Sequence, residues 1–180
     1  MTINFCSNCG GPMEQRIPEA DDHIRSVCKH CGFIHYLNPK TVVGTIPEYK
    51  DKILLCRRNI EPQKGKWTLP AGYLENGESV QDGAARETLE ETLANVKIIE
   101  PYRMFNIVHV NQIYVMFRAT LPSPEFGPTK ESMDVRLFHE KDIPWENIAF
   151  KVIKETLRNY YCDKKKGIYP FKVGDIHRHS

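Results

Sequence analysis

Apolar residues recur along this chain with two spacings, and each spacing predicts a different kind of element. Short apolar or alternating runs that end at turn-forming residues predict strands. These runs lie at 41–46, 52–57, 67–70, 96–99, 103–109, 112–120 and 135–138. Helical spacing predicts one helix that begins at Ser79 and ends near Leu93, and a second over 148–161. Strands that flank two helices predict a mixed α/β sandwich.

The predicted connections are rich in polar or turn-forming residues. A turn is predicted at 48–51, a glycine turn at Ala71–Gly72, and a Pro/Gly-rich loop at 122–129. The segment 164–180 has few periodic cues, so we expect it to be a tail that wraps on the surface.

The composition, 41% hydrophobic and 27% charged, is typical of a soluble globular protein. Its 180 residues fit one domain, or one domain with a small appended module. A net charge of +2 is too small to indicate nucleic-acid binding, so a nucleic-acid partner is not expected. No run of about 18 apolar residues is present and the N-terminal segment is not leader-like, so neither a membrane span nor a signal peptide is expected. We expect a reducing, cytoplasmic location, where the six cysteines should not form three disulfides.

Four of the cysteines form two CxxC pairs, each followed by glycine: Cys6 and Cys9 before Gly10, and Cys28 and Cys31 before Gly32. With 18 residues between the pairs, this spacing is typical of a structural Zn²⁺ site. Four thiolates complete a tetrahedral site and leave no open position, so the predicted role is structural. The alternative is four reduced or transiently bridged cysteines. Cys56 lies in an apolar run and is expected to be a small buried residue.

Three glutamates share one side of the helix predicted from Ser79. At 100° per residue, Glu87, Glu90 and Glu91 lie within an arc of roughly 100°. Arg86 can offset the charge of only Glu90, its i+4 neighbour. The opposite side, with Ala85, Leu89, Thr92 and Leu93, is expected to face the core. Such an acidic cluster suits Mg²⁺ or Mn²⁺, whereas the alternative is a solvated acidic face.

The stretch that contains these glutamates resembles the Nudix box, G-x5-E-x7-R-E-U-x-E-E-x-G-U, where U is a bulky aliphatic residue. The matching positions are Gly72, Glu78, Arg86, Glu87, Glu90 and Glu91. The chain departs from the box at Thr88, Leu93 and Ala94. None of these departures removes a carboxylate, so they concern the packing and the end of the helix.

The resemblance implies a Nudix α/β/α sandwich preceded by a small zinc ribbon: the ribbon at 1–38, the Nudix domain at 39–163 and the tail at 164–180. It implies that Glu87, Glu90 and Glu91 bind Mg²⁺ or Mn²⁺ with the Gly72 carbonyl, while Glu78 and Arg86 form a supporting salt bridge. The catalytic residues are then Glu87, Glu91 and Glu131, with Glu131 and Glu87 as rival general bases. A homodimer is expected on the resemblance alone.

A four-cysteine ribbon ahead of a Nudix domain is similar to NADH pyrophosphatases and to plant FAD pyrophosphohydrolases that also act on ADP-ribose. The first group carries an S-Q-P-W-P-F-P segment, which residues 102–107 do not match. The segment 131–138, followed by Ile143-Pro144-Trp145, resembles the second group. FAD or ADP-ribose is therefore the expected substrate, with NADH or a non-catalytic nucleotide- or RNA-sensing role as alternatives. Tyr73, Phe105 and Tyr114 are candidates for stacking on its rings, although aromatic residues in strands are more often core.

Overall fold

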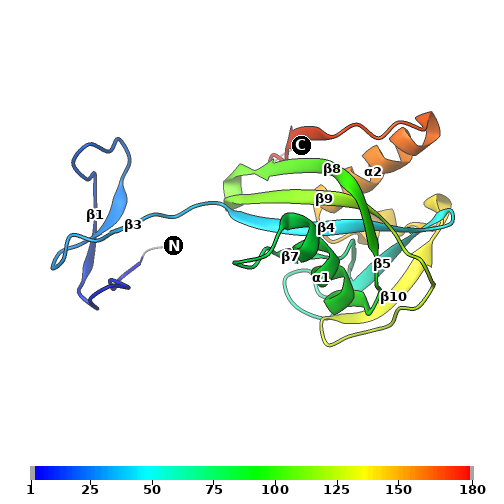
Figure 1. The fold of residues 1–180 in the computed structure, drawn as a ribbon, viewed down its shortest axis with the longest axis horizontal. Coiled ribbons are helices and arrows are strands. Elements are labelled where there is room, and N and C mark those ends of the chain that lie inside the picture. Colours follow the sequence, from blue (N-terminus) through cyan, green and yellow to red (C-terminus); the bar gives the residue numbers. More distant parts are fainter. Residues whose placement is uncertain (1–2, 179–180) are drawn as a thin grey trace. The chain divides into compact units, whose positions relative to one another are not determined.

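The computed structural model describes residues 3–178 (Figure 1). The chain divides into two compact units, Met1–Asn38 and Pro39–Ser180. Each unit has its own sheet. No helix among residues 3–178 is long and apolar enough to cross a membrane.

The N-terminal unit is a three-stranded antiparallel sheet in the order β1-β2-β3. Its strands are β1 (Met13–Arg16), β2 (Arg25–Cys28) and β3 (Ile34–His35). Within the described part of this unit, the buried hydrophobic residues are Cys6, Val27 and Cys28. Larger apolar side chains such as Phe5 are exposed. So small a core needs an additional constraint to hold its fold.

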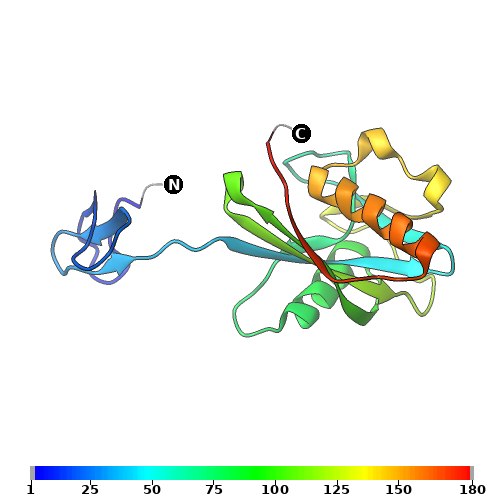
Figure 2. The ribbon, with the colours of Figure 1, turned by 90° about the horizontal axis from the view of Figure 1, so that it is seen from above.

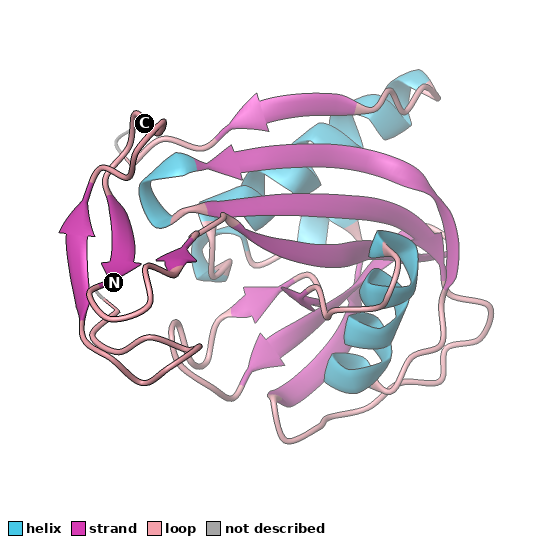
Figure 3. Cartoon of the chain, turned by 60° about the vertical axis from the view of Figure 1, so that its left-hand side comes forward, coloured by secondary structure: helices cyan, strands magenta, loops and turns pink. Residues whose placement is uncertain are grey.

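The C-terminal unit is built on an eight-stranded sheet with the order β10-β5-β4-β9-β8-β11, to which β6 adds on β5 and β7 on β4. Its strands are β4 (Lys40–Tyr49), β5 (Lys52–Arg58), β6 (Trp67–Thr68), β7 (Ala71–Tyr73), β8 (Lys97–Ile107), β9 (Gln112–Thr120), β10 (Ser132–Phe138) and β11 (Lys172–Asp175). Its helices are α1 (Val80–Thr92) and α2 (Lys151–Lys166), with 3-10 turns at Val108–Val110, Glu140–Asp142 and Trp145–Asn147. Figure 3 shows the long strands side by side, with β11 at the edge.

The two helices cover opposite faces of this sheet (Figure 2). Met116 on β9 packs in one cluster with Val152 and Leu157 of α2. Its neighbour Phe117 packs in another cluster with Ala84 of α1. Since successive strand residues point to opposite faces, α1 and α2 lie on different sides. The mixed α/β/α sandwich predicted from the sequence is confirmed.

Strand β8 spans two segments that the sequence predicted as separate strands. The prediction ended one strand at Ile99 and began the next at Arg103, and the residues between them include Pro101, which lacks the N–H that a strand donates. The strand instead continues through register shifts between Ile98 and Glu100 and between Pro101 and Arg103. Such bulges accommodate a residue that cannot complete the ladder.

Three further elements differ from the sequence prediction. Ala71–Gly72 is not a turn but part of β7, which pairs antiparallel with β4. The second helix begins at Lys151 and extends to Lys166, where Gly167 ends it in the left-handed conformation. The segment expected to be a surface tail supplies the last turn of α2 and then β11, which pairs parallel with β8.

The predicted core face of α1 was right at Thr92, which is buried, and wrong at Leu89 and Leu93, which are 41% and 56% exposed. Ala84, Thr88 and Glu91, which were not predicted to face the core, are buried. The helix therefore packs through small and polar side chains, which hydrophobic spacing does not reveal. The Thr88 hydroxyl, where the Nudix box has an aliphatic residue, lies 2.6 Å from the Thr45 hydroxyl and donates to the Ala84 carbonyl at 2.7 Å. The buried hydroxyl is thus hydrogen-bonded.

Candidate functional site

Helix α1 holds the three glutamates of the predicted metal site. Ser79, at the predicted start of the helix, caps its N-terminus, because its side-chain oxygen accepts from the Asp82 N–H at 3.1 Å. At the other end Leu93 adopts the left-handed conformation (φ 60°), and its N–H donates to the Leu89 carbonyl at 2.7 Å. The family box has glycine at this position, so Leu93 takes a conformation that costs a leucine about 1–2 kcal/mol.

Arg86 binds three carboxylates with one guanidinium. Its Nε and Nη2 donate to Glu78 at 3.0 and 2.7 Å, which forms a bidentate pair. Its Nη1 donates to Glu87 at 2.8 Å and to Glu90 at 2.9 Å. Helical spacing predicted that Arg86 offsets only Glu90, and the contact with Glu87 shows that this prediction was incomplete. Arg86 also lowers the pKa of Glu78 to about 2, which keeps that carboxylate charged.

Glu87 and Glu91 lie against the backbone of β7. A Cβ on Gly72 would lie 2.1 Å from Glu87 Oε2, so only glycine leaves room for this carboxylate. Glu91 is buried, and its Oε2 accepts from the Ala71 N–H at 3.0 Å and from the Cys56 thiol at 3.7 Å. Burial raises the pKa of Glu87, and it raises that of Glu91 to about 7. Burial therefore disfavours the charged form of both carboxylates, even though Arg86 donates to Glu87.

Glu131 lies on a loop that is tied to the end of α1. Thr129 donates through its hydroxyl to the Glu91 carbonyl at 3.4 Å, and Gly127 N–H donates to the Thr92 carbonyl at 2.8 Å. The Glu131 carbonyl accepts from the Asn59 N–H at 2.7 Å. The backbone is thus held while the side chain is exposed, and its charge contributes to the raised pKa of Glu87 and Glu91.

A cavity of about 810 Å³ contains these acids. Gly72, Arg86, Glu87, Glu90, Glu91 and Glu131 all line it. Of the three aromatic candidates, Tyr73 and Tyr114 line the cavity, and Gln112 donates to the Tyr73 hydroxyl at 3.1 Å. Phe105 does not, because it is buried in the core that packs under α2. Its candidacy for ring stacking is therefore not supported by its position.

Several cavity residues were not anticipated from the sequence. Arg58, at the end of β5, packs over the Phe150 ring with 5.1 Å between its guanidinium carbon and the ring centroid, and its Nε donates to the Pro62 carbonyl at 2.8 Å. Arg58 could have been found in the sequence as a basic residue at the end of an apolar strand. The residues 176–178 also line the cavity, but nothing local in the sequence marks them.

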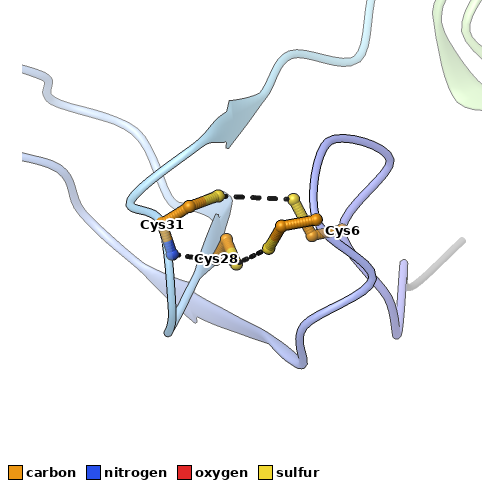
Figure 4. Close-up of side chains that lie close together, drawn as sticks. Cys6, Cys28 and Cys31 are labelled. Atoms are coloured by element: carbon orange, nitrogen blue, oxygen red, sulfur yellow. Dashed lines mark hydrogen bonds between the residues drawn. The ribbon is translucent and has the colours of Figure 1, made fainter.

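The four cysteines of the N-terminal unit lie close together, and Figure 4 shows Cys6, Cys28 and Cys31 of this cluster. Their Sγ atoms all lie within 4.8 Å of one another, with Cys6 and Cys31 3.7 Å apart and Cys9 and Cys28 3.5 Å apart. A tetrahedron with Zn–S bonds of about 2.3 Å has an edge of about 3.8 Å, so the cluster fits Zn²⁺. Gly10 and Gly32 have φ of 73° and 71°, as the knuckle turns required.

Comparison with known proteins matches both units. Residues 4–37 match the model of the Nudix N-terminal zinc ribbon, and residues 38–158 match that of the NUDIX domain. The chain belongs to the Nudix family. The four-cysteine cluster lies within the segment that matches the ribbon, and both features point to zinc binding.

This Nudix chain is similar to both curated proteins and solved structures. It is 30% identical to the NAD-capped RNA hydrolase NudC of Photobacterium profundum over 87% of its own length and 59% of that protein. Over 97% of its length and 99% of the other chain it is 50% identical to a Nudix hydrolase from Nitrosomonas europaea, with a TM-score of 0.94. An ADP-ribose pyrophosphatase from Streptococcus suis, 23% identical with a TM-score of 0.63 over 77% of this chain and 100% of its own, shares the fold.

The curated relatives are longer than this chain. The chain spans about half to two thirds of the length of the first curated relatives. The name of those relatives includes an RNA substrate, so the mild net charge alone does not exclude a nucleic-acid partner.

Proposed function

We propose that this chain hydrolyses the diphosphate linkage of a nucleoside diphosphate derivative. The observation that carries the proposal is one cavity with carboxylates on α1 and an arginine on β5. Glu87, Glu90 and Glu91 line it together with Arg58, which has no carboxylate partner among residues 3–178. Burial raises the pKa of Glu91, and the charge of Arg58 opposes this rise, so Arg58 acts on the same site. The phosphates of a substrate could thus contact the Arg58 guanidinium and metal ions held by the α1 carboxylates.

The acidic cluster fits Mg²⁺ or Mn²⁺, because every donor is an oxygen. Glu87, Glu90 and Glu91 would hold the ions with the Gly72 carbonyl. The raised pKa values of Glu87 and Glu91 support this, since buried like charges favour a bound cation. When bound, such ions neutralise the diphosphate and lower the pKa of water.

The protein's own residues orient the reaction. Arg86 and Glu78 hold β7 and α1 together, because Arg86 also donates to the Tyr73 carbonyl at 3.2 Å. Arg58 binds a phosphate oxygen of the substrate. Glu131 accepts the proton of the attacking water, and Glu87 is the alternative base, since both line the cavity.

FAD or ADP-ribose is the proposed substrate, supported by the sequence of residues 131–138 and by the mismatch at 102–107. The structure places 102–107 within β8, where Tyr102 and Phe105 are buried. NADH or an NAD cap is the second candidate, and it is supported by the name of the NudC relatives. The homodimer expected from the family is a proposal that sedimentation velocity tests.

The decisive experiment measures nucleotide release from FAD, ADP-ribose, NADH and NAD-capped RNA with Mg²⁺ or Mn²⁺. We expect turnover of at least one dinucleotide, and Glu91→Gln should lower kcat by at least 100-fold. Glu125→Gln is the matched control, because Glu125 is exposed and does not line the cavity. Absence of turnover with every substrate would favour a nucleotide-sensing module instead. A fully active Glu91→Gln enzyme would disprove the metal site.

A further inference from the structure

The C-terminal segment is anchored beside the substrate cavity. Strand β11 pairs parallel with β8, with Asp175 opposite Asn106. The Asn106 side-chain amide donates to the Asp175 carboxylate at 2.9 Å, and the Ile176 N–H donates to the Asn106 carbonyl at 2.9 Å. Ile176 is 7% exposed and belongs to the core under α2. The chain therefore has a defined position up to the residue that precedes His177.

The residues after β11 form part of the cavity wall. Ile176, His177 and Arg178 line the same cavity as the α1 glutamates. Lys151 Nζ donates to the His177 carbonyl at 3.4 Å, which ties the segment to α2. Arg178 is exposed and has no ion-pair partner within the described part of the chain. Its guanidinium is therefore available to a ligand.

This wall and the acids lie beside different strands of the sheet. Val42 on β4, Tyr114 on β9 and Ile107 on β8 line the cavity in the order of their strands, and the β11 segment follows. Neighbouring strands are about 4.8 Å apart, so β11 lies about 14 Å from β4. The acids are on the β4 side, since Gly72 pairs with Val43 of β4. A diphosphate held at the acids therefore leaves the β11 side of the cavity open to another part of the substrate.

We propose that Arg178 is a substrate-binding residue for the distal half of an elongated dinucleotide, the nucleoside that extends from the diphosphate across β9 and β8. This rests on the proposed function and narrows its substrate class to dinucleotides with two nucleoside halves. A planar guanidinium with five donors binds the acceptor atoms of a base or stacks on its ring. Tyr114 lies between the two ends of the cavity, where the linking ribose would pass.

The test distinguishes a contact between Arg178 and the distal nucleoside from a contact between Arg178 and the diphosphate. Arg178→Ala is compared with Lys172→Ala, which removes one positive charge from the same segment at an exposed residue outside the cavity. We measure KM and kcat for FAD and NADH, and Ki for inorganic pyrophosphate as the diphosphate-only probe. Arg178→Ala should raise KM for the better dinucleotide about tenfold, with kcat and the pyrophosphate Ki within about twofold of wild type. Lys172→Ala should match wild type in all three.

Two results would overturn the proposal: an unchanged KM in Arg178→Ala, or a pyrophosphate Ki that rises in parallel with KM. Arg178→Ala should unfold at the wild-type temperature, which excludes a structural cause. If the wild-type chain turns over neither dinucleotide, the proposed function fails. The affinity for FAD and NADH is then measured from their fluorescence, and equal affinity in wild type and Arg178→Ala would reject the Arg178 site independently.

Discussion

Gly72 offers the most direct test of the acidic site, because its missing side chain leaves the space that Glu87 occupies. In Gly72→Ala the new Cβ would lie 2.1 Å from Glu87 Oε2, 2.3 Å from Cδ and 2.5 Å from Oε1. Ordinary contacts of a Cβ begin near 3.4 Å. The carboxylate must therefore move by more than about 1 Å, and a displacement of that size at a reacting centre costs about 100-fold in rate.

The fold should tolerate this change. The clashing atoms are the end of a flexible side chain, and Gly72 is not among the residues with positive φ, so alanine fits its backbone. We expect kcat with the best substrate to fall about 100-fold while the melting temperature stays close to that of wild type. The loss should appear at saturating Mg²⁺ and Mn²⁺ alike.

Gly127→Ala is the matched control, because a Cβ there would meet only Leu93 Cδ1 at an ordinary 3.6 Å. It should keep wild-type kcat. If Gly72→Ala kept at least half of the wild-type kcat, Glu87 would not need its present position, and its assignment as a metal ligand would be wrong. A parallel loss of melting temperature and activity in Gly72→Ala would show that the clash is absorbed by the backbone.

Three further outcomes are expected. Without divalent ions, burial raises the pKa of Glu91 from an ordinary 4.5 to about 7. The folded state therefore binds this proton more tightly than the unfolded state does. The free energy of unfolding should fall by roughly 3 kcal/mol as pH rises from about 4.5 to above 7. Urea titrations across this range should show that Glu91→Gln removes this fall, and a difference between the two proteins that does not vary with pH would contradict the reasoning. Leu93→Gly should raise the free energy of unfolding by about 0.5–1 kcal/mol, since glycine relieves the positive φ and costs only some backbone entropy; a destabilised variant in the same titration would refute this. Elemental analysis should find one zinc per wild-type chain and a clear deficit in Cys31→Ser, whereas an undiminished zinc content would mean that Cys31 is not a ligand.

The parts that the sequence predicted correctly depend on short, fixed spacings. The two CxxC pairs and the capped carboxylate helix bring their residues together through local geometry, so spacing alone determines which side chains meet. The sandwich class follows from the same local periodicities. The helical turn also placed Glu87 and Glu91 on one side of α1, as the structure shows.

The parts that it missed depend on contacts between distant residues. Strand β11 pairs with residues about 70 positions earlier in the chain, and nothing in its own sequence specifies that partner. The core face of α1 was predicted correctly only at Thr92, because Thr88 and Glu91 are also buried, whereas Leu89 is exposed. Hydrophobicity indicates which side chains tend to be buried, but the packing of α1 on β4 determines which of them are buried.

The guanidinium of Arg86 has a consequence for how any divalent ion enters the site. It already donates to Glu87 and to Glu90, so these oxygens are not vacant ligands. An incoming ion must therefore share these carboxylates with the Arg86 guanidinium or displace it. The hydrogen bonds that Arg86 loses offset part of the attraction between the ion and the carboxylates. A substrate diphosphate adds oxygen ligands that Arg86 does not hold. Metal loading is therefore expected to be weak in the free protein and to strengthen when substrate arrives, so that ion and nucleotide bind cooperatively.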